Sequence, residues 1–458
     1  MAQDPFRQLA VIRNASQQGK QISDCYRLMY KEALWERAFE NLTGKAPDFR
    51  ERYFLQELVE RIKAQSFRFT KCSLQFSMRP LLQEWVVVEV IRIILQHIYE
   101  PVFSRNCYRC YANHGVHVAL SVVKRRFSKA TWCISGTLTD WLHKHNYQIL
   151  LTILKKKISD RRFLLLIDNL LKSNLLNIDN SIRTGKTDPR MNVLQLLKEI
   201  YLRELDQFVG KLNKNFHKKQ FSNNNHTILA QNEEIPTILH HTENEELAYV
   251  RYGDHFFIGL ATSKKQAKTV KDIVSSHIMN DLGIHPDHCT LYFAHLEKRV
   301  PFLGYAIRHC PQAKQKGKIA IRFEIPPEKA KQFARQKGYG NLDRFEAHHR
   351  GAFIHKSERE IVSIYNKELG TFAYYYRLAD NFHEITPLYY LAKKSLLKTI
   401  AQKRKMSVTA VYKRLFIEQK GTLYLRTENK RGEIAGAVFL SLPQLKKLKH
   451  KKVFSLPH

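Results

Sequence analysis

The sequence contains no apolar run near the ~20 residues that a membrane-spanning helix needs, and acidic residues are scarce relative to basic ones. Lys and Arg number 76 against 42 Asp and Glu, which gives a formal net charge of +34 over 458 residues. So large an excess attracts polyanions. RNA or DNA is the first candidate partner, and a ribosome-like structural role or an anionic membrane remains as the alternative. The length suffices for two or three domains with substantial cores.

Cysteine is too sparse and irregular for a disulfide framework. The seven Cys residues are scattered from Cys25 to Cys310, an odd number that favours a reducing compartment. The close pair Cys107 and Cys110 in "CYRC" has no second pair at zinc-ligand spacing, so we expect two buried thiols and no metal. The first residues show neither a signal sequence nor a transit segment. If the protein works in an organelle, we therefore expect it to be made there.

Hydrophobic periodicity predicts helices over most of residues 24–126, and "EWVVVEVIRIILQHIYEPVF" indicates a buried helix that stops at Pro101. Residues 131–175 predict a strand, "TWCISG", followed by two helices. The Asn-rich, locally acidic segment 221–247 is typical of a surface loop or insertion.

The stretch "YVRYGDHFFIG", residues 249–259, has two apolar-alternating runs around Gly253 and Asp254. This pattern predicts a β-hairpin with Asp254 at its tip and His255 beside it. A helix and an extended stretch ending in "FLGYAI" are expected to follow. Strands and helices in this order indicate an α+β arrangement.

Beyond the basic stretch "RHCPQAKQKGK", which we expect to be a linker, the pattern changes. Residues 326–416 predict helix almost throughout. The end of the chain, with "KKLKHKK" at 446–452, is a charge run whose ordinary interpretation is a solvated or phosphate-binding tail.

Collinear blocks over about residues 25–416 resemble the group II intron-encoded maturases, which join a reverse-transcriptase region to a thumb called domain X. The blocks are "LMYKEALWERAFENL", "RPLLQEWVVVEVIRIILQHIYEPVF", "ISDRRFLLLIDNLL", "IYLRELDQFV", "YVRYGDHFFIG", "FLGY", "IVSIYNKELGTFAYYYRLA" and "SLLKTIAQKRK". The resemblance implies an α+β right-hand fold with reverse-transcriptase-like fingers and palm and an all-helical thumb. Its predicted parts are an N-terminal helical and fingers region (1–125), a degenerate palm (126–310), a helical thumb, domain X (320–420), and a basic tail (421–458).

Polymerases of this kind need two divalent ions held by carboxylates, and the matching positions have mostly lost them. Where the family has an Asp after a Gly, this chain has Thr137, a poor ligand for Mg²⁺. Asp254 matches the first carboxylate of the family's Tyr-Ala-Asp-Asp signature, and His255 replaces the second. Thr137, Asp254 and His255 are therefore expected to be relic positions, with no catalytic residue, bound metal or cofactor. Asp140 lies three residues after Thr137, on the opposite face of an extended segment.

Other family blocks are altered in the same direction. A second family Asp is His143, a phosphate-handling Arg is Tyr111, and the Lys of a later block is His288. The Pro-Gln-Gly-Gly block is missing near "KTDPRM". No Cys follows Cys310, so the zinc-bearing nuclease segment of many relatives is expected to be absent.

Domain X is expected to bind RNA. Ile361, Tyr365, Phe372 and Tyr376 recur at helical spacing on what is most simply a core face. Tyr374 and Arg377 are then expected on the other side, able to stack on a base or grip phosphate, although tyrosines in a helix commonly pack in a core.

In the next helix, Lys394, Lys398 and Lys405 are spaced by four and seven residues and are expected to form one basic stripe. Helix neighbours at i and i+4 lie about 6 Å apart, which is comparable to the phosphate spacing of RNA. Ser395 and Thr399 are expected to share the face of the stripe and add hydroxyl contacts. A solvated lysine face is the alternative. The predicted RNA-binding residues are Tyr374, Arg377, Lys393, Lys394, Ser395, Lys398, Thr399, Lys403, Arg404 and Lys405.

The resemblance thus implies a degenerate maturase that binds structured group II or group III intron RNA and assists its splicing, without polymerase or endonuclease activity. The expected site of action is the plastid, with the mitochondrion as the alternative; no membrane is implied, and a homodimer is left open. One rival is an RNA-directed DNA polymerase with displaced ligands, for instance Asp140 and Asp254. The other is a general basic RNA-binding protein with little preference for an intron.

Overall fold

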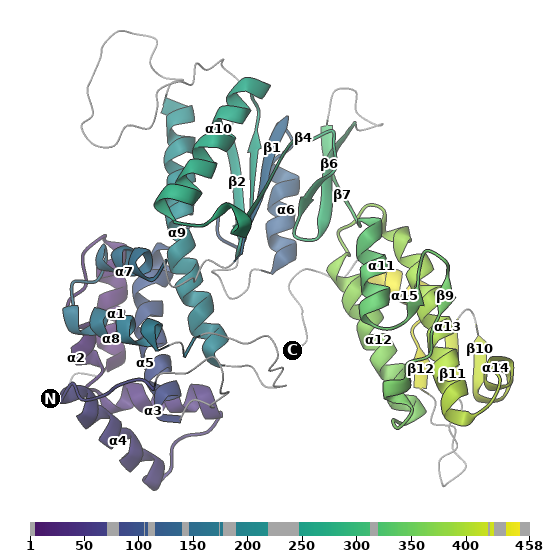
Figure 1. Cartoon of the computed structure of the whole chain (residues 1–458), viewed down its shortest axis with the longest axis horizontal. Coiled ribbons are helices and arrows are strands. Elements are labelled where there is room, and N and C mark those ends of the chain that lie inside the picture. The colour runs from purple at the N-terminus through teal and green to yellow at the C-terminus, as the bar shows by residue number, and fades with distance from the viewer. Residues whose placement is uncertain are drawn as a thin grey trace. The chain divides into compact units, whose positions relative to one another are not determined.

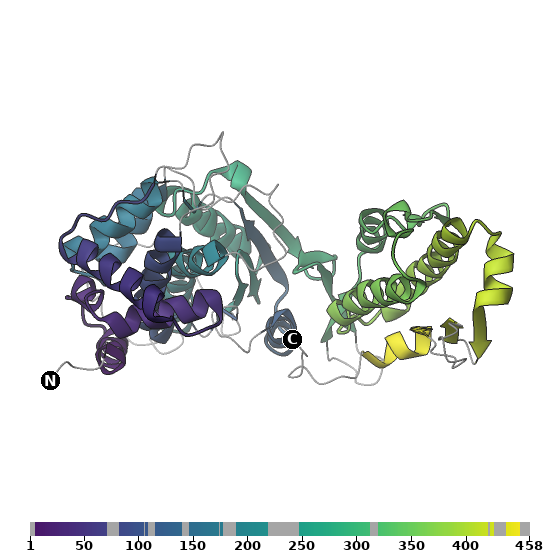
Figure 2. The ribbon, with the colours of Figure 1, turned by 90° about the horizontal axis from the view of Figure 1, so that it is seen from below.

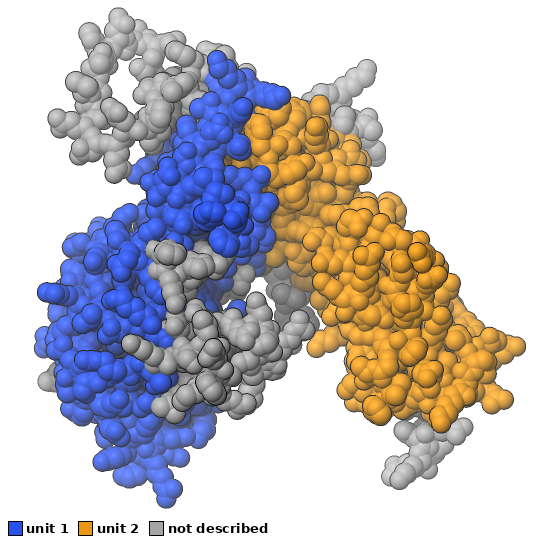
Figure 3. Space-filling view, viewed as in Figure 1, with its two compact units in different colours: residues 1–112, 136–256, 263–291 blue, residues 113–135, 257–262, 292–458 orange. Residues whose placement is uncertain are grey.

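The computed structural model divides the chain into two compact units, coloured separately in Figure 3. Unit 1 comprises residues 1–112, 136–256 and 263–291, and unit 2 comprises residues 113–135, 257–262 and 292–458. The described residues are 5–70, 82–104, 106–108, 115–139, 146–173, 175–176, 189–218, 247–311, 319–419, 422–425 and 437–448. The predicted loop 221–247 lies almost wholly outside them. Each unit is built from several separate segments of the chain. The division into four consecutive parts that was expected from the sequence therefore stays a prediction.

Unit 1 is largely helical, and its helices include the buried α5 (Figure 1). Up to residue 218 they are α1 (Pro5–Gln17), α2 (Cys25–Leu28), α3 (Glu32–Thr43), α4 (Phe49–Lys63), α5 (Leu82–Tyr99), α7 (Tyr147–Lys155), α8 (Arg161–Lys172) and the long α9 (Pro189–Lys218). Helices α1 and α9, the first and the last of these, were not predicted from the sequence. Helix α5 is buried along both its Val-rich and Ile-rich faces and gives way to a 3-10 turn, Glu100–Val102, at Pro101, as predicted. Asp160 caps α8 by accepting hydrogen bonds from Arg162 and Phe163 backbone N–H groups.

A four-stranded sheet has the strand order β2-β3-β1-β4. Its strands are β1 (Trp132–Leu138), β2 (Leu247–Tyr252), β3 (His255–Leu260) and β4 (Cys289–His295), with α6 (Val116–Arg126) and α10 (Lys264–Ser276) as neighbouring helices in the sequence. The hairpin predicted at 249–259 is confirmed, and Gly253 supplies its turn with φ 62°. Gly136 on β1 leaves room for Phe256, whose ring atoms would lie 2.1 Å from a Cβ at that position.

The first four residues of the stretch expected to be a linker belong to a second sheet, of order β5-β6-β7, and the rest lies outside the described residues. Strand β6 (Tyr305–Pro311) pairs antiparallel with β5 (Val300–Phe302) and with β7 (Ile319–Glu324). The prediction of a linker is therefore wrong for Arg308–Pro311. The basic composition suggested a solvated segment, but alternate side chains of β6, such as Ile307 and His309, are buried, as is typical of a strand.

The part of unit 2 that follows β7 contains the helices predicted at 326–416, together with α15 (Leu442–Lys447), which was not predicted; Figure 2 shows them from a second direction. The predicted helices are α11 (Pro327–Gln336), α12 (Glu358–Tyr375), α13 (Ile385–Arg404) and α14 (Val408–Leu415). Ile361, Tyr365, Phe372 and Tyr376 are all buried, so the predicted core face is confirmed. A capping box formed by Ser357 and Glu360 begins α12.

This part is not all-helical, and that prediction is wrong. A short hairpin, β8 (Gly340–Asn341) and β9 (Glu346–Ala347), precedes α12. A three-stranded antiparallel sheet, β10 (Phe416–Gln419), β11 (Thr422–Leu425) and β12 (Ala437–Phe439), follows α14. The expected basic tail is thus partly folded, because Leu423, Leu425 and Phe439 are buried. The α+β class itself is confirmed.

Candidate functional site

The hairpin turn in unit 1 presents Asp254 and His255 beside Thr137 of β1. The Thr137 hydroxyl lies 2.9 Å from His255 Nδ1, and the Leu138 backbone N–H donates to the Asp254 carbonyl. The other imidazole nitrogen of His255 is 4.0 Å from Asp254 Oδ1. The structure therefore brings the three predicted relic positions together in one small constellation.

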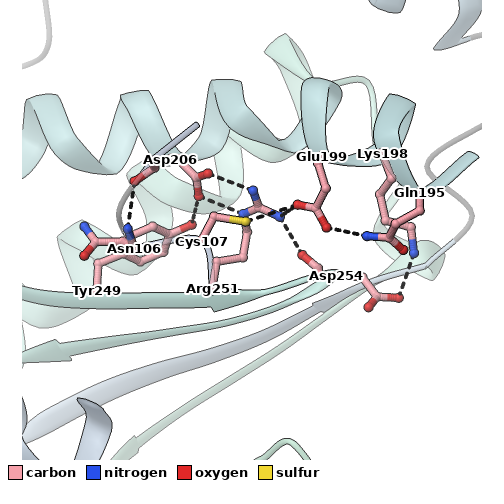
Figure 4. Close-up of polar contacts among 11 residues, drawn as sticks. Asn106, Cys107, Gln195, Lys198, Glu199, Asp206, Tyr249, Arg251 and Asp254 are labelled. Atoms are coloured by element: carbon pink, nitrogen blue, oxygen red, sulfur yellow. Dashed lines mark hydrogen bonds and ion pairs between the residues drawn. The ribbon is translucent and has the colours of Figure 1, made fainter. Parts of the chain in front are cut away.

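A lysine completes this constellation, and the sequence analysis missed it. Lys198 of α9 places its ammonium 3.4 Å from Asp254 Oδ2, as Figure 4 shows. The two side chains are 21% and 29% exposed, so the ion pair is partly shielded from water. Lys198 lies more than fifty positions before the hairpin, and only the folding of α9 along it reveals the contact.

These residues do not fit a pair of catalytic metal ions. Two-metal chemistry needs several anionic oxygen ligands, whereas this site offers one carboxylate, a neutral hydroxyl, an imidazole and a competing ammonium. Among the residues that the structure describes, no three His, Cys, Asp or Glu side chains lie together as a metal site. The candidate ligand Asp140, with His143 and Tyr111, lies outside the described residues.

Behind the turn, a fully buried arginine is held by two carboxylates of α9 (Figure 4). Arg251 donates from Nε and Nη2 to Asp206, at 2.7 Å each, and from Nη1 to Glu199 at 2.6 Å. It also donates to the Gly253 carbonyl at 2.8 Å. The Tyr249 hydroxyl donates to Asp206, and burial together with the Asp206 charge raises the pKa of Tyr249. The cluster fixes the turn from inside the unit.

Cys107 approaches the same cluster, with its Sγ 3.2 Å from Glu199 Oε2. The structure records Cys107 in a disulfide bond, so the expectation of a free thiol at this position is wrong. Cys110 lies outside the described residues. The free cysteines among the described residues are Cys25, Cys133, Cys289 and Cys310.

In unit 2, the expected RNA-facing pair at the end of α12 is placed differently from the prediction. Arg377 is only 1% exposed, and its guanidinium lies 4.6 Å from the centre of the Tyr374 ring. Tyr374 is half-buried and meets His117 edge-on. Arg377 does not lie on an exposed face, and the prediction that it does is wrong. The chain turns after Tyr375, so helical spacing no longer places residue 377.

The predicted basic stripe on α13 is exposed at Lys394 and Lys398. Lys405 is exposed too, but it caps the helix in a left-handed conformation with φ 52°. It therefore does not continue the helical stripe.

The other predicted cations of α13 already have partners. Lys393 is paired with Glu418 at 3.0 Å, and Arg404 with Glu358 at 2.7 Å. Lys403 donates to the Ile354 carbonyl at 3.2 Å. Lys398 also has a partner, since it donates to the Ala347 carbonyl at 2.8 Å, but Lys394 and Lys398 are the two lysines of the helix whose side chains are exposed.

Ser395 and Thr399 lie on the core face, and the prediction that they share the lysine face is wrong. Both are 0% exposed. Ser395 Oγ donates to the His348 carbonyl at 2.6 Å, and Thr399 Oγ1 accepts from the Arg350 backbone N–H at 3.0 Å. The hydroxyls hold a neighbouring segment and are not free for phosphate.

Two aromatic side chains beside the lysines were missed. Phe345 is 37% exposed and Tyr390 is 46% exposed. The Lys394 ammonium lies 4.3 Å from the centre of the Phe345 ring. The spacing of Tyr390 four residues before Lys394 could have drawn attention to it, whereas Phe345 comes from a distant hairpin and gave no such signal.

Comparison with known proteins gives one family match, which covers residues 324–455 and is described as type II intron maturase. The chain is 28% identical over 398 residues to the group II intron-encoded protein LtrA of Lactococcus lactis subsp. cremoris, covering 77% of this chain and 66% of that protein. It is 23% identical over 403 residues to the uncharacterized mitochondrial protein ymf11 of Marchantia polymorpha, covering 71% and 54%. It is 28% identical over 123 residues to nuclear intron maturase 4, mitochondrial, of Arabidopsis thaliana, covering 26% and 15%. The chain spans less than two thirds of the length of these relatives.

Proposed function

Because the chain carries a type II intron maturase domain and is similar to group II intron-encoded proteins, we propose that it is an intron maturase. It binds structured group II or group III intron RNA and assists splicing, without polymerase or endonuclease activity. The RNA performs the transesterifications, and the protein contributes binding free energy and orientation.

The observation that carries the proposal is the exposed pair Lys394 and Lys398 within the residues that match the maturase family. A surface of this kind neutralises phosphates, and the net charge of +34 supports a polyanionic partner. At the hairpin, the Asp254 carboxylate is paired with the Lys198 ammonium at 3.4 Å. This pairing supports loss of polymerisation.

The proposed location is an organelle. The sequence favoured the plastid, with the mitochondrion as the alternative. The names of the Marchantia and Arabidopsis relatives include the word mitochondrial, which supports the alternative. Among the described residues, no helix is long and apolar enough to cross a membrane. A homodimer stays an untested prediction.

The test is equilibrium binding of the full chain to its host intron RNA and to an unrelated structured RNA of equal length, across a salt series. A Lys394→Ala/Lys398→Ala/Lys405→Ala variant is measured alongside. Each lost phosphate contact lowers the slope of log K against log salt by roughly 0.7–0.9, so the triple variant is expected to lower it by about 2–3. Intron binding by the wild type is expected to survive competition by the unrelated RNA.

A matched control removes the same charge from unit 1, at exposed positions of α10: Lys264→Ala/Lys265→Ala/Lys268→Ala. This variant is expected to keep the preference for the intron. Equal affinity of the wild type for both RNAs would overturn the proposal in favour of a general basic RNA-binding protein. Primer extension on an RNA template in Mg²⁺ tests the polymerase alternative, and no incorporation is expected.

A further inference from the structure

The β8–β9 hairpin exposes an aromatic ring at a strained backbone position. Phe345 lies in its turn with φ 54°, a left-handed conformation that bulky residues rarely adopt, and its side chain is 37% exposed. Neither burial nor turn chemistry explains a phenylalanine here, since Gly or Asn would relieve the strain and a polar residue would suit water.

The hairpin is tied to α13 by side chains that the sequence had assigned to RNA. Ser395 donates to the His348 carbonyl, and Lys398 donates to the Ala347 carbonyl at 2.8 Å. Thr399 accepts from the backbone of Arg350. These hydrogen bonds set the position of the hairpin relative to the exposed face of α13, so the Phe345 ring is presented on a fixed support.

The exposed face of α13 completes a surface that combines rings and ammonium groups. Tyr390, Lys394 and Lys398 recur at intervals of four residues and therefore share one face of the helix. The Lys394 ammonium lies over the Phe345 ring at 4.3 Å from its centre. We call Phe345, Tyr390, Lys394 and Lys398 the aromatic–lysine platform.

We propose that this platform binds unpaired nucleotides of the RNA, with bases stacked on Phe345 and Tyr390 and phosphates held by Lys394 and Lys398. The inference rests on the proposed function, and it assigns to the surface a preference for single-stranded segments. Aromatic rings stack on any base but reach only bases that have left a duplex. The Cβ atoms of the two lysines, four positions apart on one helix, are about 6 Å apart, so their flexible side chains can reach successive phosphates.

Charge favours an anionic occupant over a basic or apolar protein, and the exposed rings favour RNA among anions because bases can stack on them. Arg344, His348 and His349 are exposed on and beside the hairpin. Of the two hairpin carboxylates, Asp343 is already held by Lys331 at 2.7 Å, with Arg335 at 3.6 Å, and Glu346 is exposed. The surroundings of the rings are therefore net positive, as a phosphate backbone requires.

The test measures binding of a fluorescent single-stranded RNA oligonucleotide, and of the same strand annealed to its complement, to the full chain. Phe345→Ala and Tyr390→Ala are each expected to weaken single-strand binding by about 5- to 150-fold, with little effect on the duplex. Neither variant is expected to change the salt slope, because neither removes a charge. Tyr390→Phe keeps the ring and is expected to bind as the wild type does.

Phe49→Ala on α4 is the matched control. Phe49 is 85% exposed in unit 1, and this substitution removes the same aromatic ring from a different surface. If circular dichroism shows that Phe345→Ala does not fold, the comparison of Tyr390→Ala with Tyr390→Phe tests the proposal. Wild-type single-strand affinity in both alanine variants, or an equal loss on duplex, would overturn the platform. Loss on the single strand alone would uphold it, even if the intron proved no better a ligand than unrelated RNA. That second result would overturn the maturase proposal by itself.

Discussion

Replacing Arg251 by Met tests whether the hairpin of unit 1 depends on its internal ion cluster. Arg251 is 0% exposed and makes a two-pronged contact with Asp206 and a third contact with Glu199. Methionine matches the aliphatic part of the arginine side chain but lacks the guanidinium group, so the change removes the charge and its hydrogen bonds together. It strands two carboxylates, 4% and 1% exposed at the side chain, without their cation.

Removing one partner of a buried ion pair costs about 3–5 kcal/mol, and we expect Arg251→Met to fall in that range. This range already includes the lost hydrogen bond to the Gly253 carbonyl, because the same guanidinium group makes that bond and the ion pairs. Hydrogen exchange at the amides of β2 and β3 reports opening of this region separately from the rest of a two-unit chain. Protection there is expected to fall by roughly 200- to 5,000-fold.

Two controls separate the charge effect from general damage. Arg37→Met breaks an exposed pair with Glu40 at 3.4 Å and is expected to cost under ~1 kcal/mol. The triple variant Arg251→Met/Asp206→Asn/Glu199→Gln removes all three charges and is expected to recover more than half of the loss. If Arg251→Met left protection at β2 and β3 within tenfold of the wild type, the cluster would not be what holds the turn.

Two further predictions concern ions and protons. Mg²⁺ is expected to leave the melting temperature of the wild type unchanged, whereas Thr137→Asp/His255→Asp, which surrounds Asp254 with carboxylates, is expected to be stabilised by Mg²⁺; an equal response in both proteins would contradict this. Burial lowers the pKa of His117, whose Nε2 lies 2.9 Å from the Tyr375 carbonyl. The neutral ring therefore stabilises the fold when the pH is above 6.5, the ordinary pKa of histidine. This contribution is lost as the pH falls through the lowered pKa of His117. Urea midpoints at pH 7.5 and 5.5 are expected to differ less in His117→Gln than in the wild type.

The sequence predicted best where the signal was local. The apolar repeat of α8, the buried α5 and the hairpin around Gly253 all depend on neighbours within a few residues. The sheet β10-β11-β12 was missed because its strands have three or four residues each, and Leu423 pairs with Phe439 across an intervening segment. Short strands carry little periodicity, and their pairing is decided by contacts distant in the chain.

At the helical surface, an error of one position on the helix reversed the assignment. Ser395 follows Lys394 by about 100° around the axis, which is enough to move it from water to the core. A closer reading of the apolar pattern would have helped, because Leu391, Leu396 and Ile400 flank the two hydroxyl residues on the buried side. Small polar residues inside such a stripe commonly bond to backbone within the core.

Charged groups of the protein itself hold the hairpin turn. Several carboxylates gathered at one turn repel one another unless cations lie between them. Here neither Thr137 nor His255 contributes a negative charge, and Lys198 supplies a fixed cation to the remaining carboxylate of Asp254. Arg251 secures the turn from the buried side. The β2–β3 turn is therefore held by cations of the protein itself, Lys198 at the carboxylate and Arg251 at the backbone.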